Sequence, residues 1–238
     1  MINVLKTEMY KFKFKKGTLI SFISLIIVSM IFAALFHQYL TSAGVDGTAN
    51  MWTKVGNAGL YSIYFLLMVV VLTNITVTSD YIKGNISTQI MSGSNKVNIY
   101  LSKIIVLISA TIISLLISFI TIILTMGIVY GFGEWGLDTF KHMFNVYGRM
   151  IVYVLPFISL YGLLGFIIKN EVGVAVVSFF SITFLGLFAG LFTKVLKIND
   201  KFMEYMWFNY LHLDFRYEES LRSWIICSFI AFLVFLFI

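Results

Sequence analysis

The chain has 238 residues, of which 60% are hydrophobic and 12% are charged, with a formal net charge of +6. An ordinary soluble domain has about 45–50% apolar and about 25% charged residues, so this composition excludes a water-soluble fold and predicts one polytopic membrane domain over residues 1–238. The cations gather at the ends of apolar stretches, which favours the anionic face of a membrane over nucleic acid as their partner. The single cysteine, Cys227, excludes an intrachain disulfide.

Residues 1–17 are basic and carry apolar side chains at helical spacing. Leu5, Met9 and Phe12 fall at i, i+4 and i+7 among several lysines, as in helices that lie in the headgroup layer of a membrane. A plain basic flank that obeys the positive-inside rule is the alternative interpretation. The segment lacks the pattern of a cleavable signal peptide. Both interpretations place the N-terminus in the cytoplasm.

Six apolar stretches follow, each near the roughly 20 residues that a helix needs to cross a bilayer. They cover residues 18–40, 59–78, 104–130, 150–168, 172–195 and 221–238. We therefore predict an all-α polytopic membrane protein with six transmembrane helices, whose even number returns the C-terminus to the cytoplasm. The positive-inside rule supports this orientation through the lysines of the first segment and of the loops after the second and fourth spans.

The polar segment 79–103 separates the second span from the third and must lie at a membrane face. Ile86, Ile90 and Met91 are spaced to share one side of a short helix, and the flexible Gly84 precedes them. We predict an amphipathic cytoplasmic helix that is placed to receive a push from a soluble partner.

Hydroxyl side chains recur in steps of three and four along the third span, at Thr111, Ser114, Ser118, Thr121 and Thr125. Small hydroxyl residues let helices approach closely in lipid and form hydrogen bonds across the contact. The stripe therefore predicts either a packing seam or a surface that lines a substrate path.

The fourth and fifth spans meet at a short polar turn, Lys169-Asn170-Glu171, which is either a plain hairpin turn or a second, smaller contact point for the partner. Pro156 predicts a kink in the fourth span. One face of the fifth span carries a phenylalanine at every fourth residue, at Phe180, Phe184, Phe188 and Phe192. That row either lines an apolar path or faces lipid. In the second span, the amide of Asn74 is expected to find a partner on another helix.

Residues 196–220, before the last span, interleave acidic residues with aromatic ones such as Tyr205, Trp207 and Tyr210. Tyrosine and tryptophan are enriched at the interfaces of membranes, where one end of the ring is apolar and the other is wet. We predict a re-entrant outer loop whose amphipathic segments enter the outer interface.

Several kinds of chemistry lack their usual residues. No Asp, Glu, Lys or Arg lies near the middle of a predicted span, where each costs about 2.5–3.5 kcal/mol and usually marks an ion or proton path. The chain has no Gly-x-x-x-x-Gly-Lys-Ser/Thr phosphate loop and no His-Glu-x-x-His pair for zinc. Ion-coupled transport, ATP hydrolysis by this chain and metalloprotease activity are therefore disfavoured. We expect no enzymatic activity, no catalytic residue and no metal site.

An acid and a glycine lie close together at Asp80 and Gly84, followed by Lys96 and by Lys103 at the head of the third span. With this pattern and its six spans, the chain resembles the permease subunits of type-2 ATP-binding-cassette exporters, in particular the short stand-alone permeases of Gram-positive bacteria. The resemblance covers the whole length. The chain departs from the family where Asp80 replaces the usual Glu, where Lys96 replaces the usual Arg, and in lacking a proline near Ser92.

The resemblance implies a pair of permease halves, identical or homologous, bound to two copies of a separate ATPase subunit that carries ATP and Mg²⁺, with no cofactor in this chain. The second and fifth spans would face the other half. The residues that contact or couple to the ATPase would be Asp80, Tyr81, Gly84, Ile86, Ile90, Met91 and Lys96. Candidates for the translocation path are Asn74, Phe180, Phe184 and Phe188. The expected location is the bacterial cell membrane, with both termini in the cytoplasm.

A path without buried charge and rich in Phe, Met and Leu suits a hydrophobic or amphipathic cargo. Small permeases of this kind often export antimicrobial or toxic peptides, or protect the producer from them, so a peptide is the expected cargo. A drug or lipid exporter, a non-transporting immunity or assembly protein, and a secondary transporter are the alternatives.

Overall fold

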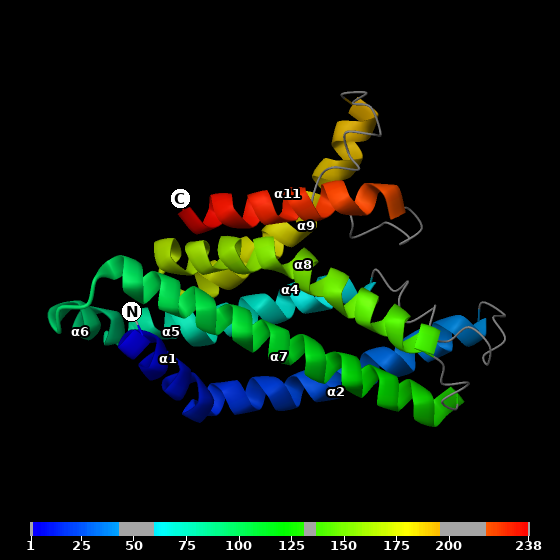
Figure 1. The fold of residues 1–238 in the computed structure, drawn as a ribbon, viewed down its shortest axis with the longest axis horizontal. Helices are drawn as coiled ribbons and strands as arrows, with labels where there is room; N and C mark the ends of the chain where they lie inside the picture. The colour runs from blue at the N-terminus through cyan, green and yellow to red at the C-terminus, as the bar shows by residue number, and fades with distance from the viewer. Residues whose placement is uncertain (1, 43–59, 131–136, 196–217, 238) are drawn as a thin grey trace.

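The computed structural model describes residues 2–42, 60–130, 137–195 and 218–237, and these ranges are helical apart from short turns, with no strand among them. Figure 1 shows the helices in chain order from blue to red. Their bounds are α1 Ile2–Phe14, α2 Lys16–Ser42, α4 Leu60–Thr73, the π-helix η1 Asn74–Thr78, α5 Ser79–Ile82, α6 Asn85–Met91, α7 Lys96–Tyr130, α8 Leu137–Ile168, α9 Glu171–Val195 and α11 Glu218–Phe237. The predicted all-α class is confirmed for the described residues.

Two of the described helices, α7 and α8, contain segments long and apolar enough to cross a membrane, Lys96–Thr125 and Tyr147–Ile168. The number rises to four if each of two bent helix pairs forms one span: Ile2–Phe14 with Lys16–Ile31, bent by 59°, and Leu66–Ile82 with Asn85–Met91, bent by 63°. The chain is therefore a helical protein with spans that suit a membrane. Six spans remain a prediction, and the predicted re-entrant loop 196–220 lies almost wholly outside the described residues.

The apolar core lies where α4, α7 and α8 meet. Leu66, Leu107, Phe157 and Tyr161 are fully buried there. α2 and α1 pack against α7, and α11 runs along α8. The start of α1, the end of α11 and the short helix α6 lie at the same end of the molecule (Figure 1). This shared end is where the polar side chains discussed below come together.

The hydroxyl stripe of α7 faces neighbouring helices. Thr111, Ser114 and Ser118 are buried, and Ser29 of α2 donates a hydrogen bond of 3.2 Å from its Oγ to Ser118 Oγ. Thr111 and Ser114 donate to carbonyl oxygens of their own helix, one turn earlier. These contacts favour the packing seam, because the hydroxyl groups are occupied within the bundle.

Pro156 lies inside α8, which continues on both sides of it from Leu137 to Ile168. The close approach of α8 to the end of α4 depends on a glycine further along. A Cβ atom at Gly165 would lie 3.1 Å from Val77 Cγ1 and 3.2 Å from Thr73 Cγ2. Both neighbours are β-branched and stiff at χ1, so they cannot easily move away.

We expect Gly165→Ala to lower the free energy of unfolding by about 1–3 kcal/mol, because the added methyl overpacks this contact. Gly148→Ala in the same helix is the matched control, since no described atom lies within 4 Å of a Cβ built there, and alanine gains roughly 0.5–1 kcal/mol over glycine in a helix. Thermal unfolding of both variants in detergent, followed by circular dichroism, measures the difference. Equal midpoints would contradict the close contact.

Candidate functional site: a buried ionic cluster

A buried lysine joins three helices at the end of the bundle. Lys103 of α7 is only 1% exposed. Its Nζ donates to Glu8 Oε2 of α1 at 2.7 Å, to Asp80 Oδ2 of α5 at 2.5 Å and to the carbonyl oxygen of Thr76 at 3.0 Å. All three hydrogen atoms of the ammonium group therefore have an acceptor, as a buried charge requires.

The second oxygen of Asp80 binds a second lysine. Lys15 Nζ donates to Asp80 Oδ1 at 3.2 Å, to Ser79 Oγ at 2.6 Å and to the carbonyl oxygen of Ile75 at 2.5 Å. Asn85 Nδ2 also donates to Asp80 Oδ1 at 3.2 Å. Asp80 thus connects the α1–α2 junction, the head of α7 and the start of α6 through a single carboxylate.

The π-helix η1 supplies acceptors to both lysines. A π-helical turn interrupts the regular i→i+4 ladder and is common at functional sites. The carbonyl oxygens of Ile75 and Thr76 lie within η1 and accept from Lys15 and Lys103 respectively. The wider turn of η1 therefore lies where the ammonium groups of Lys15 and Lys103 approach the helix backbone.

Glu8 connects this cluster to the short helix α6. Its Oε1 accepts from Gln89 Nε2 at 2.5 Å and from Lys11 Nζ at 3.2 Å, while its Oε2 accepts from Lys103. Gln89 lies in α6. A displacement of α6 would therefore pull on Glu8 and, through Lys103, on α7. We call Glu8, Lys11, Lys15, Asp80, Gln89 and Lys103 the ionic cluster.

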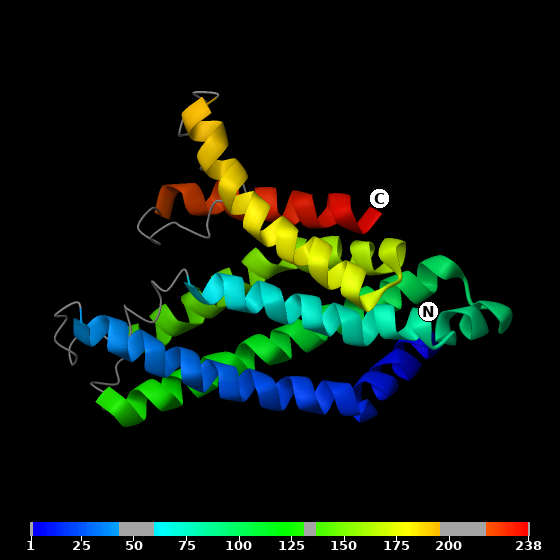
Figure 2. The same cartoon turned by 180° about the vertical axis from the view of Figure 1, so that it is seen from behind.

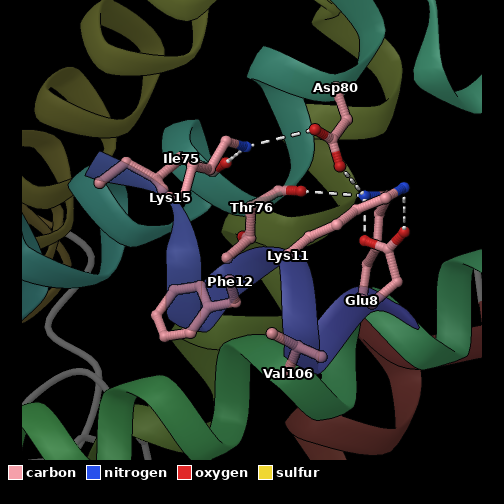
Figure 3. Close-up of a pocket in the computed structure, with 9 residues that line it drawn as sticks. Glu8, Lys11, Phe12, Lys15, Ile75, Thr76, Asp80 and Val106 are labelled. Carbon is pink, nitrogen blue, oxygen red and sulfur yellow. Dashed lines mark hydrogen bonds and ion pairs between the residues drawn. The ribbon is translucent and has the colours of Figure 1, made fainter. Parts of the chain in front are cut away.

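Figure 3 shows the small pocket that the ionic cluster, apart from Gln89, lines together with Phe12, Ile75, Thr76 and Val106. The carboxylates of Glu8 and Asp80 and the amino groups of Lys11 and Lys15 turn toward one another there (Figure 3). The groups are ion pairs and amides rather than an activated nucleophile with its base. No three His, Cys, Asp or Glu side chains within the described ranges are grouped to hold a metal ion.

The electrostatic balance keeps both carboxyl groups ionised. Burial is the largest single influence and would raise the pKa of Glu8 and of Asp80. The charge and hydrogen bond of Lys103, together with the other lysine and the amide beside each carboxyl, outweigh it, and both pKa values lie below their ordinary 4.5 and 3.8. Burial lowers the pKa of Lys15 below its ordinary 10.5, because the attraction of Asp80 offsets this effect only in part. Opposite charges within hydrogen-bonding distance thus keep both carboxyl groups deprotonated.

The lowered pKa values predict a loss of stability in acid. Above the ordinary pKa values, both carboxylates are ionised in the folded and the unfolded chain, and their full stabilising effect is present. As the pH falls below about 4.5, the unfolded chain binds protons first, so the free energy of unfolding falls until the folded groups also titrate. Unfolding midpoints in detergent between pH 7 and pH 3 measure this slope. Glu8→Gln should flatten it, and an unchanged slope would assign the acid sensitivity to other carboxyls.

The structure places the predicted coupling residues in different surroundings. Asp80 enters the ionic cluster, and Gly84, with φ of +68°, lies at the bend between α5 and α6, where the left-handed conformation favours glycine. Tyr81 packs edge-on against Phe166 of α8, with ring centroids 5.5 Å apart. Lys96 is exposed at the first position of α7.

The predicted apolar side of α6 is wrong in one respect. Ile86 is 5% exposed and packs inward, whereas Ile90 is 38% exposed and Met91 is 79% exposed. A step of five residues turns a helix by about 140°, so Met91 cannot share the face of Ile86. Ile86 holds α6 in place, and Ile90 and Met91 are the apolar side chains available to a partner.

The turn between α8 and α9 contacts the same region. Lys169 Nζ lies 5.5 Å from the centroid of the Tyr81 ring, and Asn74 Nδ2 donates to the carbonyl oxygen of Glu171 at 3.2 Å. Asn74 therefore has the predicted interhelical partner. It lies at the level of this turn rather than deep within a span, which differs from its predicted place in a translocation path.

The other path candidates lie on α9. Phe180 and Phe184 are exposed on the single chain, with ring centroids 6.2 Å apart. The side chain of Phe188 lies outside the described residues.

Glu8 and Gln89 were missed by the sequence analysis, and Lys15 was treated only as part of a basic tail. One signal was present: Glu8 is the only acid of α1 and stands three residues after Leu5 and four before Phe12. An acid among the apolar positions of a basic helix indicates a buried partner of opposite charge.

Comparisons of the chain with protein-family models, with curated proteins and with solved structures find no match. The functional proposal below therefore depends on the ionic cluster and on the exposed end of α6.

Proposed function

We propose that the chain is the permease subunit of an ATP-binding-cassette exporter in a bacterial cell membrane, with six spans, an interfacial N-terminal helix, a cytoplasmic coupling helix and a re-entrant outer loop. It forms half of a path for a hydrophobic or amphipathic cargo, and an antimicrobial or toxic peptide is the first candidate. A separate ATPase subunit, present in two copies, binds ATP and Mg²⁺ and supplies the energy. The second permease half is identical or homologous.

The observation that carries this proposal is the mechanical connection of α6. Its apolar tip, Ile90 and Met91, is exposed at the end of the molecule, while Gln89 on the same short helix is bonded to Glu8. Glu8 shares Lys103 with Asp80, so a push on α6 reaches α1 and α7 together. A ligand-driven change needs such an element, whose position two sites can both bias.

The test is affinity purification of the full chain from its own host in mild detergent, with identification of the proteins that copurify and an assay of ATPase activity. We expect a soluble ATPase in near-equal amount, which is lost in Ile90→Asp/Met91→Asp because two carboxylates would disrupt an apolar contact. Ile86 is left intact, since its burial makes an aspartate there a folding defect. Val97→Asp, an exposed change at the start of α7, is the matched control.

The alternatives make different predictions in the same experiment. Capture of no ATPase under gentle extraction would overturn the exporter proposal and favour an immunity or assembly protein. Proton- or sodium-dependent uptake in vesicles without ATP would instead indicate a secondary transporter. A captured ATPase whose activity responds to lipids or drugs but not to peptides would keep the permease and replace the cargo.

A further inference from the structure

The outer face of α1 differs from the face that its sequence pattern predicts. Leu5 and Phe12 are partly buried and turn toward the bundle with Glu8, whereas Met9 is exposed. Tyr10 and Phe14 are 66% and 64% exposed. The exposed apolar or charged residues between positions 2 and 16 form one surface, which we call the outer face of α1: Ile2, Lys6, Met9, Tyr10, Lys13 and Phe14 of α1, and Lys16 at the start of α2.

All the charged residues of the outer face are positive. Glu8, the only acid of α1, is buried against Lys103 and Gln89 on the opposite side of the helix. The exposed charged groups are therefore Lys6, Lys13 and Lys16. Burial of the acid thus separates the charges of this helix: the ion pairs lie inside the bundle, and unbalanced cations lie outside.

The aromatic groups on this face are arranged next to the cations. The ring centroids of Tyr10 and Phe14 are 4.6 Å apart, and Lys13 Nζ lies 5.8 Å from the centroid of the Phe14 ring. Aromatic rings beside lysines are typical of helices at the boundary between headgroups and acyl chains.

The outer face also continues into an apolar surface. α1 turns away from α2 by 59°, and Figure 2 shows it leaving the end of α2 toward the end of the bundle that carries α5 and α6. Just after the bend, Leu19, Ile20, Ile23 and Ile27 of α2 are exposed. A membrane that covers these side chains would meet the outer face of α1 at its polar boundary.

We propose that the outer face of α1 binds the headgroups of anionic phospholipids. The inference rests on the membrane location in the proposed function and not on the ATPase or the cargo. Each lysine near an anionic bilayer surface strengthens binding by about fivefold, so Lys6 and Lys13 together contribute roughly 25-fold. A neutral bilayer would offer the aromatic rings the same boundary but would leave the lysines without counter-charges.

The test uses the full chain with Tyr10→Cys and Cys227→Ala, labelled at position 10 with an environment-sensitive fluorophore. The protein is placed in nanodiscs of phosphatidylcholine alone or mixed with phosphatidylglycerol, and quenching by acrylamide, which is uncharged, is measured. We expect a blue shift and at least twofold weaker quenching in the anionic discs. Lys6→Gln/Lys13→Gln should return both values to those in neutral discs.

Lys83→Gln/Lys96→Gln is the matched control, because it removes two exposed lysines at the same end of the molecule from another surface. It should leave the lipid response unchanged. Equal quenching in both kinds of disc, or a response that persists in Lys6→Gln/Lys13→Gln, would overturn the proposal. Since the fluorescence does not depend on a bound ATPase, failure of the exporter proposal alone would leave this result unaffected.

Discussion

Lys103→Met is expected to lower the free energy of unfolding by about 3–5 kcal/mol, because it leaves two carboxylates buried without their shared cation. Methionine keeps most of the length and volume of lysine, so the packing of α7 against α1 changes little. The loss would come from Glu8 and Asp80, which now repel each other and retain fewer hydrogen bonds. Thermal unfolding in detergent, followed by circular dichroism, is the measurement.

A compensating variant separates this electrostatic effect from a general packing defect. Lys103→Met/Glu8→Gln/Asp80→Asn removes the three charges that meet at Lys103 Nζ, while the amide oxygen at position 80 can still accept from Lys15. Replacing a buried ion pair or triad by neutral groups is often close to neutral in stability. We expect it to recover more than half of the loss. If the triple variant is as unstable as Lys103→Met, the side chain of Lys103 matters for its shape and not for its charge.

Asp80→Ala is expected to cost about 2–4 kcal/mol, less than the loss of Lys103, because Lys103 keeps Glu8 as a partner. The main loss falls on Lys15, which would retain only the neutral acceptors Ser79 Oγ and the Ile75 carbonyl oxygen. Unfolding midpoints at pH 7 measure the loss. The same variant should weaken the connection between α5 and the head of α7. Under the proposed function, it should therefore also weaken the response of ATPase activity to cargo.

Lys15→Met should reduce the loss of stability caused by Asp80→Ala, because it removes the cation that has lost its counter-charge. In a double-mutant cycle we expect a coupling energy of about 1–3 kcal/mol between these positions. Lys96→Met in place of Lys15→Met is the control, since Lys96 is exposed at the first position of α7 and can stay hydrated. Equal relief by both lysine variants would mean that net charge, and not the Lys15–Asp80 pair, sets the stability.

Two predictions about the polar segment 79–103 had different outcomes: the structure has the predicted bend at Gly84, but it does not place Met91 on the same side as Ile86. The bend at Gly84 is visible in the sequence, because a glycine between a polar helix end and an apolar-periodic run marks a local backbone requirement. The inward position of Ile86 cannot be read from the sequence, because three apolar residues in one short helix do not reveal which of them packs against the bundle. The packing of α6 against the rest of the bundle decides that.

The sequence by itself determined the class of this protein and the places where its chain is polar. Apolar stretches of bilayer length and cations at their ends are local properties, and they predict helices that suit a membrane wherever the chain folds. Only the tertiary structure decided that Glu8, Asp80 and Lys103 meet. Lys103 is 23 residues from Asp80 and 95 residues from Glu8 in the chain. The packing of the helices, which no local pattern encodes, decides which buried charges meet. That same packing turned Glu8 inward and left lysines as the only charged residues on the outer face of α1.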